Sequence, residues 1–399
     1  MKKNILFIIP SLNVGGGEKS LVSLLNQMNY SKYNVDLFLI KKKGLFLKMI
    51  PNEVNIVSTP ESLKIFSKGL AESIKEYLKM MDLKLVYSRI MFALVNRFCK
   101  DKIKSEQKSW KYMSKGIGKL DKKYDVAIGF LEKTSNYLCV DNVTADKKIG
   151  WIHTNYENMG MSAKFDKRYF KSLDFIVSIS EECVEVLKKN FNMYNDKFKL
   201  MYNIVSPKFI QELAKEDVTD IEIKKNVINI ISVGRLSFEK GIDLSIKACK
   251  LLIDNGFNIH WIVVGEGNER NNLEQLISYY KLEKYFQLIG AKENPYKYIQ
   301  LSDIYVQASR FEGKSIAIDE AKILAKPIVV TNFDTAKDQI ENMINGLIVE
   351  TNENAIYEGV KRIIEDFELR KNLKSNLDNC QLGTESEIYK LYELIEGNN

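Results

Sequence analysis

The stretch "INIISVGRLSFEKGIDLSIKA", residues 228–248, runs from an apolar β-rich segment through two glycines into a helical pattern. Units of strand, loop and helix are typical of parallel sheets with crossover helices. The loop of this unit carries Arg235 and Lys240. Both cations suit a diphosphate when they emerge at the carboxyl end of a parallel strand, where ligands of open α/β sheets bind. Taken alone, an Arg and a Lys in a loop are more often solvated surface, so other motifs must decide.

The same alternation of strand and helix recurs along the chain. The predicted strands are 4–9, 35–40, 126–130, 148–153 and 175–179 in the first half, and 227–233, 259–264, 286–289, 303–308 and 327–331 in the second. A chain of 399 residues is too long for one ordinary core, and two domains imply a cleft.

The charged segment 203–225 predicts where the two domains meet. The resulting division is an N-terminal Rossmann-like domain over 1–205 with a basic helical insert over 62–120, a C-terminal Rossmann-like domain over 206–380, and a terminal helix over 381–399.

Composition excludes several classes of protein. A chain with 45% hydrophobic and 28% charged residues is typical of a folded soluble protein. Five scattered cysteines without a C-x-x-C pair argue against a disulfide framework and a zinc site. The short apolar run at the N-terminus leads into a glycine turn, which favours the first strand of a cytosolic domain over a signal peptide. No run of ~18 apolar residues that could span a bilayer occurs.

The net charge of +7 is concentrated in one segment of the first half. Residues 62–125 contain sixteen Lys or Arg and seven Asp or Glu, a balance of +9. Within this segment one helical stripe is apolar: Tyr87, Ile90, Met91, Leu94, Val95 and Phe98. Such a basic amphipathic helix can lie on anionic lipid. The alternative is a helix whose apolar stripe packs in the core and whose basic face is solvated.

The glycine turn "SLNVGGGEKS", residues 11–20, lies between a predicted strand and a predicted helix. It matches the dinucleotide fingerprint only in part, and the second strand ends in "LFLIKKK" where an NAD-binding protein has an acid for the ribose. A nicotinamide enzyme is therefore disfavoured. Two interpretations stay open: a loop whose backbone approaches an anion, and a structural turn with left-handed glycines.

The motif "ASRFEGKSIAIDEAK", residues 308–322, contains Gly-Lys-Ser but not a P-loop. A P-loop requires glycine at position 308, where this chain has Ala308, and Glu312 would repel a triphosphate. The motif instead predicts a helix whose N-terminal N–H groups face outward, with Glu312 before it and Glu320 about two turns on. The two glutamates could reach two parts of one elongated ligand. Alternatively, Glu312 complements the helix dipole and Glu320 is an ordinary helical residue.

Taken together, these motifs resemble the retaining GT-B glycosyltransferases of family four, the glycosyl transferases group 1. The pieces that carry the resemblance are "GGGE" at 15–18, "WIHTN" at 151–155, "SVGRLSFEKG" at 232–241, "VVGEGNER" at 263–270 and "SRFEGKSIAIDEAKILAKPIVVT" at 309–331. The resemblance implies an α/β chain of the GT-B fold, with two doubly wound Rossmann-like domains facing a cleft. The C-terminal domain would bind the nucleotide sugar, and the N-terminal domain would face the acceptor.

The resemblance also implies roles for single residues. Arg235 and Lys240 would hold the diphosphate, Glu312 would contact the transferred sugar, and Glu320 would accept hydrogen bonds from the ribose. Gly313 and the N–H groups of Lys314, Ser315 and Ile316 would lie at the sugar or phosphate oxygens. Gly15 and Gly16 would approach the diphosphate from the opposite domain. His153 would lie near the reacting sugar. Lys314 departs from many family members and leaves the choice of donor sugar open.

The implied activity is a metal-independent hexosyl transfer, with retention, from a UDP-sugar to a hydroxyl of a saccharide or lipid-linked acceptor of a bacterial surface polysaccharide. We expect no cofactor, no metal, since the chain has no D-x-D motif, and no nucleic-acid partner. The expected location is the cytoplasm, either free or on the inner face of the plasma membrane. Two alternatives remain, a UDP-sugar epimerase of the same architecture and a non-catalytic nucleotide-sugar-binding protein.

Overall fold

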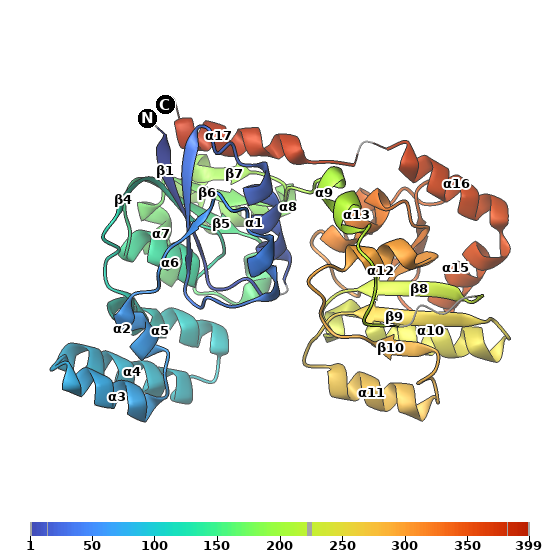
Figure 1. The fold of residues 1–399 in the computed structure, drawn as a ribbon, viewed down its shortest axis with the longest axis horizontal. Helices are drawn as coiled ribbons and strands as arrows, with labels where there is room; N and C mark the ends of the chain where they lie inside the picture. Colours follow the sequence, from blue (N-terminus) through green and yellow to red (C-terminus); the bar gives the residue numbers. More distant parts are fainter. Residues whose placement is uncertain (1, 14, 222–225, 381, 398–399) are drawn as a thin grey trace. The chain divides into compact units, whose positions relative to one another are not determined.

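The computed structural model describes residues 2–13, 15–221, 226–380 and 382–397. It consists of two compact units (Figure 1). Unit 1 contains Met1–Ile204 and Glu385–Asn399, and unit 2 contains Val205–Thr384. Each unit is built around one parallel sheet, as expected for an α/β protein with two Rossmann-like domains.

The sheet of unit 1 has seven parallel strands in the order β3-β2-β1-β4-β5-β6-β7. Their bounds are β1 Lys3–Ile9, β2 Tyr33–Leu39, β3 Asn55–Ile56, β4 Lys123–Gly129, β5 Thr144–Ile152, β6 Phe175–Ser178 and β7 Phe198–Leu200. Side chains along β1 alternate between two cores. Leu6 and Ile8 contribute to the core on one face, and Ile5, Phe7 and Ile9 to the core on the other. A sheet buried on both faces explains why these strands read as continuous apolar runs.

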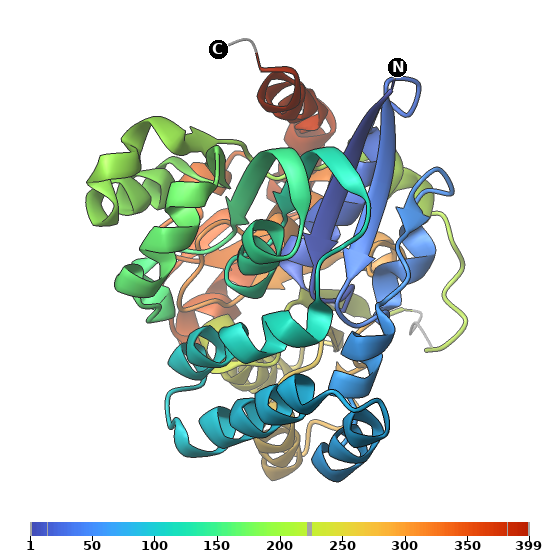
Figure 2. The same cartoon turned by 90° about the vertical axis from the view of Figure 1, so that its left-hand side faces the viewer.

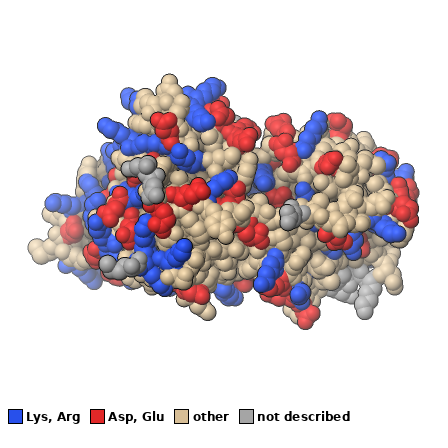
Figure 3. Space-filling model, turned by 90° about the horizontal axis from the view of Figure 1, so that it is seen from above, with Lys and Arg blue, Asp and Glu red and all other residues tan. Residues whose placement is uncertain are grey.

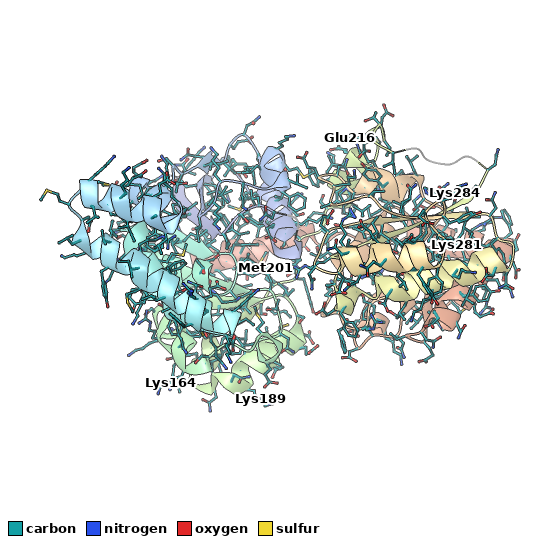
Figure 4. All side chains as sticks on the ribbon, turned by 90° about the horizontal axis from the view of Figure 1, so that it is seen from below. Lys164, Lys189, Met201, Glu216, Lys281 and Lys284 are labelled. Carbon is teal, nitrogen blue, oxygen red and sulfur yellow. The ribbon has the colours of Figure 1, made fainter. Side chains whose placement is uncertain are left out.

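Helices cover both faces of this sheet. Their bounds are α1 Gly16–Gln27, α2 Glu61–Phe66, α3 Leu70–Lys79, α4 Leu83–Phe98, α5 Lys102–Ile117, α6 Thr134–Asp141, α7 Ala163–Ser172 and α8 Glu181–Asn190. Helices α2 to α5 follow one another between β3 and β4, in the region of the predicted basic insert. Helices α3 and α4 lie at the outer edge of unit 1, away from the sheet (Figures 1 and 2). On α7 and α8, Lys164 and Lys189 point outward from the unit (Figure 4).

The chain returns to unit 1 at its C-terminal end. Helix α17, Ile388–Glu396, belongs to unit 1 and places Ile388, Leu391 and Ile395 in the same core as α1. At its end Glu396 pairs with Lys3 at 2.6 Å, at the start of β1. The terminal helix predicted over 381–399 therefore covers the face of a sheet whose strands lie far away in the sequence. Residues 381, 398 and 399 of that prediction lie outside the described residues.

Unit 2 repeats the plan with six parallel strands in the order β10-β9-β8-β11-β12-β13. The strands are β8 Ile228–Val233, β9 Ile259–Val264, β10 Phe286–Leu288, β11 Ile304–Gln307, β12 Ile328–Thr331 and β13 Leu347–Val349. The helices are α9 Pro207–Leu213, α10 Ile242–Asp254, α11 Arg270–Tyr279, α12 Tyr296–Leu301, α13 Ile316–Ile323, α14 Ala336–Gln339, α15 Glu353–Glu365 and α16 Phe367–Asp378. Neighbouring residues of β8 again serve opposite faces, Ile230 one core and Ile231 the other.

All ten predicted strands are present, with ends displaced by at most four residues. The sequence did not predict β3, β7 and β13, each of two or three residues at or near a sheet edge. The charged segment 203–225 is not an open linker, because Val205 and Ile210 are buried in a core of unit 2. Its last four residues, 222–225, lie outside the described residues. In the described ranges no helix has the length and apolar character needed to cross a membrane.

The docking of α17 can be tested with one substitution. Leu391 is fully buried in the core of unit 1, so Leu391→Ala should remove apolar contacts and lower the free energy of unfolding by ~2–5 kcal/mol. Urea denaturation followed by circular dichroism measures the change. Tyr389 on the same helix is 65% exposed, and Tyr389→Ala serves as the control with an expected change below ~1 kcal/mol. Equal stability of Leu391→Ala and the parent would show that α17 does not dock.

Candidate functional site

Three loops meet at the carboxyl edge of the sheet of unit 2. They follow β8 (residues 234–241), β9 (265–267) and β11 (308–315). A Cβ atom on Gly241 would lie 2.0 Å from the carbonyl oxygen of Ala308, and one on Gly265 would lie 1.8 Å from that of Gly234. Gly241 also has φ +61°, a conformation that only glycine adopts without strain. The glycines therefore let the backbones of three loops touch at one point.

This contact brings Lys240 to Glu312. The Lys240 ammonium lies 2.5 Å from Glu312 Oε1, and 25% of the Lys240 side chain and 9% of the Glu312 side chain remain exposed. The methylene carbons of Lys240 pass within 3.5–3.8 Å of the Cβ position of Gly234. Two residues 72 positions apart in the sequence thus form one partly buried ion pair at the predicted ligand edge.

Glu312 is held by two further donors that the sequence did not identify. Gln307 Nε2 and Ser309 Oγ each donate a hydrogen bond of 2.7 Å to Glu312 Oε1. Gln307 is itself oriented by the hydroxyl of Tyr305, which donates to its Oε1 at 2.6 Å. In the described part of the chain every hydrogen bond to this carboxylate reaches Oε1. The lone pairs of Oε2 are therefore left for a ligand.

Arg235 follows Gly234 directly at the end of β8 and is exposed. Among the described residues its guanidinium forms no ion pair, in contrast to Lys240. The loop that carries it is braced by Arg310, which forms two hydrogen bonds of 2.7 and 2.8 Å to Asp243. Arg310 also stacks over the ring of Phe238 with its guanidinium carbon 4.2 Å from the ring centre. Arg310 is thus held in structural contacts, whereas Arg235 faces solvent.

The N-terminus of α13 follows Glu312, as the sequence predicted. A Cβ atom on Gly313 would meet no protein atom within 4 Å, so this position is open to a ligand. The N–H of Ser315 is already used, because it donates to Gln339 Oε1 at 2.8 Å, and Gln339 Nε2 donates back to the Ser315 carbonyl at 2.8 Å. Lys314 lies 3.6 Å from Asp319. Ile316 is the first residue of α13.

Glu320 occupies a different environment from Glu312. It lies on α13 with 1% of the residue exposed, and the hydroxyl of Tyr296 on α12 donates to its Oε1 at 3.2 Å. Burial and the nearby Glu320 carboxylate raise the pKa of Tyr296, which keeps this hydroxyl protonated as a donor. Glu320 is thus not an ordinary exposed helical residue. A buried carboxylate held in this way has one fixed orientation.

The predicted residues of unit 1 lie at the carboxyl edge of its own sheet. Gly15 precedes α1, and the carboxylate of Glu18 folds back so that Oε2 lies 2.2 Å from the Cβ position of Gly15. This carboxylate is an anion at a helix N-terminus, where a phosphate would otherwise bind. Gly16 is the first residue of α1. A Cβ atom on Gly17 would lie 2.6 Å from Leu131 and 3.8 Å from the His153 ring, so the glycine turn packs directly on the loops after β4 and β5.

His153 follows β5 and packs beside two aromatic side chains that also contact each other. Its ring centre lies 5.0 Å from that of Phe130 and 6.1 Å from that of Trp151. Both ring nitrogens are buried, and neither has a hydrogen-bond partner among the described residues. Burial lowers the pKa of His153 to about 3, partly opposed by the backbone of Phe130. The imidazole is therefore neutral at physiological pH.

Glu132 is a site residue that the sequence analysis missed. It follows β4 and accepts a hydrogen bond of 3.1 Å from the backbone N–H of His153. Burial raises the pKa of this carboxyl group, and the His153 N–H opposes the shift. The next residue, Lys133, has φ +61° and ψ −116°, a strained conformation for a residue other than glycine. A titratable group beside backbone strain at a sheet edge is typical of functional sites, but no motif spacing marks Glu132 in the sequence.

A large groove lies elsewhere in unit 2 and is unsuited to a nucleoside diphosphate. It has a volume of about 1020 Å³ and runs along β13 and α15. Its lining contains five carboxylates, Glu350, Glu358, Glu365, Asp366 and Glu368, and two cations, Lys361 and Arg362. This surplus of negative charge would repel a phosphate, and none of the predicted site residues lines the groove.

Comparison with known proteins places this geometry in context. Residues 214–379 match the model of the family "Glycosyl transferases group 1". This match includes Arg235, Lys240, Glu312 and Glu320. One relative is N-acetylgalactosamine-N,N'-diacetylbacillosaminyl-diphospho-undecaprenol 4-alpha-N-acetylgalactosaminyltransferase of Campylobacter jejuni. The two sequences are 29% identical over 238 residues, and this alignment covers 59% of this chain and 63% of the relative.

A second relative is UDP-Gal:alpha-D-GlcNAc-diphosphoundecaprenol alpha-1,3-galactosyltransferase of Escherichia coli. It is 25% identical over 214 residues, which cover 51% of this chain and 55% of the relative. The chain thus aligns with less than two thirds of the length of both relatives. Among solved structures, Anabaena Alr3699/HepE in complex with UDP and glucose is similar with a TM-score of 0.66 and 16% identity, covering 100% of both chains. This likeness shows that the fold is GT-B.

The contact between Gly241 and Ala308 yields a prediction about loop geometry. Gly241→Ala should be destabilising by more than ~2 kcal/mol, because the new methyl group adds a clash with the Ala308 carbonyl to the strain of a positive φ. The measurement is urea denaturation. Gly256 has φ +81° and no neighbour within 4 Å, so Gly256→Ala is a matched control that carries the φ strain alone. Similar losses in both variants would contradict the close approach of the loops.

The environment of His153 predicts how stability depends on pH. The unfolded chain protonates His153 below pH ~6.5, whereas the folded protein does so only near pH 3. Protonation therefore favours the unfolded state, and the free energy of unfolding decreases as pH falls from ~6.5 toward 3. His153→Phe should remove this loss. Relative to the variant, the parent should lose ~2 kcal/mol between pH 7.5 and pH 5, as measured by urea denaturation at each pH.

Burial also raises the pKa of Glu132, and this shift acts in the opposite direction, because it favours the folded state as pH falls. The comparison is therefore repeated in a Glu132→Gln background, where only His153 differs. Parallel stability curves for the parent and His153→Phe in both backgrounds would show that His153 is not buried in its neutral form.

Proposed function

We propose that the protein is a retaining, metal-independent hexosyltransferase, since residues 214–379 match the model of the glycosyl transferases group 1 family. The donor is a UDP-sugar, and the acceptor is a hydroxyl of a saccharide or lipid-linked saccharide in bacterial surface polysaccharide synthesis. The two bacterial relatives named above, whose names refer to diphospho-undecaprenol saccharides, support this acceptor class. A structural neighbour that holds UDP and glucose supports the donor class. The reaction takes place on the cytoplasmic side of the membrane.

The observation that carries the proposal is the Lys240–Glu312 pair beside the exposed Arg235. Departure of a nucleoside diphosphate builds negative charge on the leaving phosphate. Arg235 offers a planar fork of donors to this charge, and Lys240 offers an ammonium that Glu312 already holds in position. An ammonium that is already held in place, as that of Lys240 is, requires little reorganisation when the charge develops. This is the main requirement for stabilising such a leaving group without a bound metal.

Glu312 and Glu320 divide the remaining donor contacts. The second oxygen of Glu312 accepts a hydrogen bond from the transferred sugar, while Oε1 stays bound to Lys240, Gln307 and Ser309. Glu320 accepts from the ribose hydroxyls. The opening at Gly313 admits the phosphate or sugar oxygens to the N-terminus of α13. The Ser315 N–H, which donates to Gln339, contributes only if that side chain releases it.

The remaining predicted residues lie in unit 1, with Gly15 and Gly16 assigned to the diphosphate and His153 to the reacting sugar. Gly15, Gly16 and His153 belong to the carboxyl edge of its sheet, and Glu132 joins them there. A neutral imidazole has one acceptor nitrogen, so His153 can accept a hydrogen bond from a sugar hydroxyl if its buried ring turns toward the ligand. The proton of the acceptor hydroxyl passes to a phosphate oxygen of the departing nucleotide, which gives front-face attack and retention. No side chain needs to act as a covalent nucleophile.

The donor site predicts a loss of nucleotide affinity in one variant. Arg235→Ala should weaken UDP binding by roughly 10- to 100-fold, since hydrogen bonds between charged groups contribute ~1.5–3 kcal/mol. Isothermal titration calorimetry with UDP measures the dissociation constant. Lys250, which pairs with Asp254 on α10, provides a control variant, Lys250→Ala, with the same change of net charge. A dissociation constant for Arg235→Ala equal to that of the parent would refute the assignment of the donor site.

The three candidate activities differ in their products. Incubation with a panel of UDP- and GDP-sugars and a saccharide acceptor, followed by mass spectrometry, should yield a glycosylated acceptor, and its anomeric configuration by NMR should match that of the donor. Addition of a chelator should leave the rate unchanged. An epimerase would instead convert the nucleotide sugar without acceptor. A binding protein would hold UDP without any turnover.

A further inference from the structure

The loop after β5 carries His153 at one end and is held at its other end by a buried hydrogen-bond network. It covers residues 153–162 and leads into α7. Thr154 and Glu157 are exposed, whereas Tyr156 between them is buried. The loop therefore has a polar, accessible rim and a buried anchor that lies three residues from His153.

Asp166 on α7 is the centre of this network. The residue is 2% exposed and accepts hydrogen bonds from three side chains. Tyr137 Oη donates to Oδ1 at 2.5 Å, Gln107 Nε2 donates to Oδ1 at 3.0 Å, and Tyr156 Oη donates to Oδ2 at 2.6 Å. Both oxygens of the carboxylate are thus occupied, and Oδ2 binds the loop directly.

Gln107 on α5 fastens the loop a second time. Its Oε1 accepts a hydrogen bond of 2.9 Å from the backbone N–H of Ser162, the residue before α7. Its Nε2 donates to Asp166 and, at 3.2 Å, to the hydroxyl of Tyr137. Because oxygen and nitrogen of this amide both have partners, the side chain has one satisfied orientation. The loop is therefore fixed at Tyr156 and at Ser162 through one shared centre.

The residue before Gln107 holds the neighbouring loop, which follows β4. Glu106 accepts a hydrogen bond of 2.6 Å from the hydroxyl of Thr134 and pairs with Lys133 at 3.0 Å. Lys133 directly follows Glu132, the carboxylate that accepts from the backbone N–H of His153. Two adjacent residues of α5 thus hold both loops at this part of the sheet edge.

Helix α5 supplies these contacts, and its hairpin partner α4 does not. Gln107 and Trp110 of α5 are buried. In contrast, four residues of the apolar stripe predicted on α4 are between 37% and 74% exposed: Tyr87, Ile90, Leu94 and Phe98. The interpretation in which this stripe packs in the core is therefore wrong for these four residues.

Stability alone does not account for a carboxylate at the centre of this network. Burial raises the pKa of Asp166, and the hydrogen bonds from Tyr137, Tyr156 and Gln107 oppose the shift. Charged side chains intersperse over the surface (Figure 3), and on α7 itself Lys164 points outward (Figure 4). Replacing a buried charged group and its partners by apolar side chains of the same shape is often neutral for stability. The network instead specifies one arrangement of the loop.

We propose that Asp166 is a positioning residue, which fixes loop 153–162 and with it His153 for binding of the acceptor. It acts through Tyr156 and Gln107. A loop with an exposed polar rim would otherwise have to be ordered when a saccharide hydroxyl binds, and this ordering lowers affinity. Held in advance, the loop offers the acceptor a preformed surface. The assignment to the acceptor rests on the function proposed above, whereas the fixing of the loop does not.

Hydrogen–deuterium exchange of the full chain, followed by mass spectrometry, tests the fixing of the loop. Asp166→Asn keeps the shape of the side chain but replaces one acceptor oxygen by an NH2 group. The protected amides in peptides that cover residues 153–162 should exchange about 10- to 100-fold faster, the factor expected when a hydrogen bond to a charged group is lost. Peptides from β1 and β8 should exchange as in the parent. Unchanged exchange in the loop, or equally faster exchange in β1 and β8, would overturn the proposal.

Two conservative variants keep the test decisive if Asp166→Asn does not fold. Tyr156→Phe retains the edge-on packing against Phe191, at 5.0 Å between ring centres, but removes the hydrogen bond to Asp166. It should accelerate exchange in the same peptides roughly tenfold. Tyr194→Phe is the matched control, because its hydroxyl donates to the carbonyl of Lys167 outside the loop. Equal exchange of the loop in both variants would contradict the role of the network.

A kinetic measurement separates positioning from stability. In the transfer assay above, with the acceptor that yields product, Asp166→Asn should lower kcat/KM for the acceptor about 10- to 100-fold. The KM of the UDP-sugar and the dissociation constant of UDP should stay within about twofold of the parent values. Equal losses for donor and acceptor, or parent kinetics despite faster loop exchange, would refute the acceptor role. If the parent transfers no sugar, the proposed function fails and the acceptor role fails with it, but the exchange experiment still decides whether Asp166 fixes the loop.

Discussion

The candidate donor site depends on one backbone approach, that of Gly241 to the carbonyl of Ala308. No side chain fits between these atoms, so the loops after β8 and β11 are held in direct contact. This contact decides which side chains can meet above the sheet. It places Lys240 against Glu312, and Glu312 in turn collects Gln307 and Ser309. A shift of the loop at the glycine would separate the ammonium from its carboxylate and leave the partly buried Lys240 without its anionic partner.

Sequence patterns predicted the central strands because those strands are buried on both faces. Runs such as residues 5–9 are apolar throughout, a pattern typical of a strand that is buried on both faces. The strands β3, β7 and β13 were missed because two or three residues at or near an edge carry no periodic pattern. Periodicity also failed to say which way α4 faces. A stripe at helical spacing shows that one side of a helix is apolar, but only the packing of its neighbours shows whether that side is buried.

The site was predictable where a motif fixes the spacing and unpredictable where tertiary contacts supply the partner. Arg235, Lys240 and Glu312 lie next to glycines and strand ends, and the structure places all three at one sheet edge of unit 2. Gln307, Gln339 and Glu132 are single polar residues in unremarkable surroundings along the chain. Their importance arises from hydrogen bonds to residues between 5 and 24 positions away. The roles of all the predicted site residues at a ligand stay predictions.

The electrostatics of both units share one feature that bears on how a ligand would bind. Lys240 faces Glu312, Lys314 faces Asp319, and the N-terminus of α1 faces Glu18. Each of these three positive groups thus has an internal carboxylate. Positive groups that would repel one another are kept in place by these anions, which reduces the reorganisation that ligand binding requires. The same anions weaken the attraction to an incoming diphosphate. Arg235 is exposed and has no ion pair among the described residues. A diphosphate would therefore be its first anionic partner, so Arg235 should contribute most to nucleotide affinity.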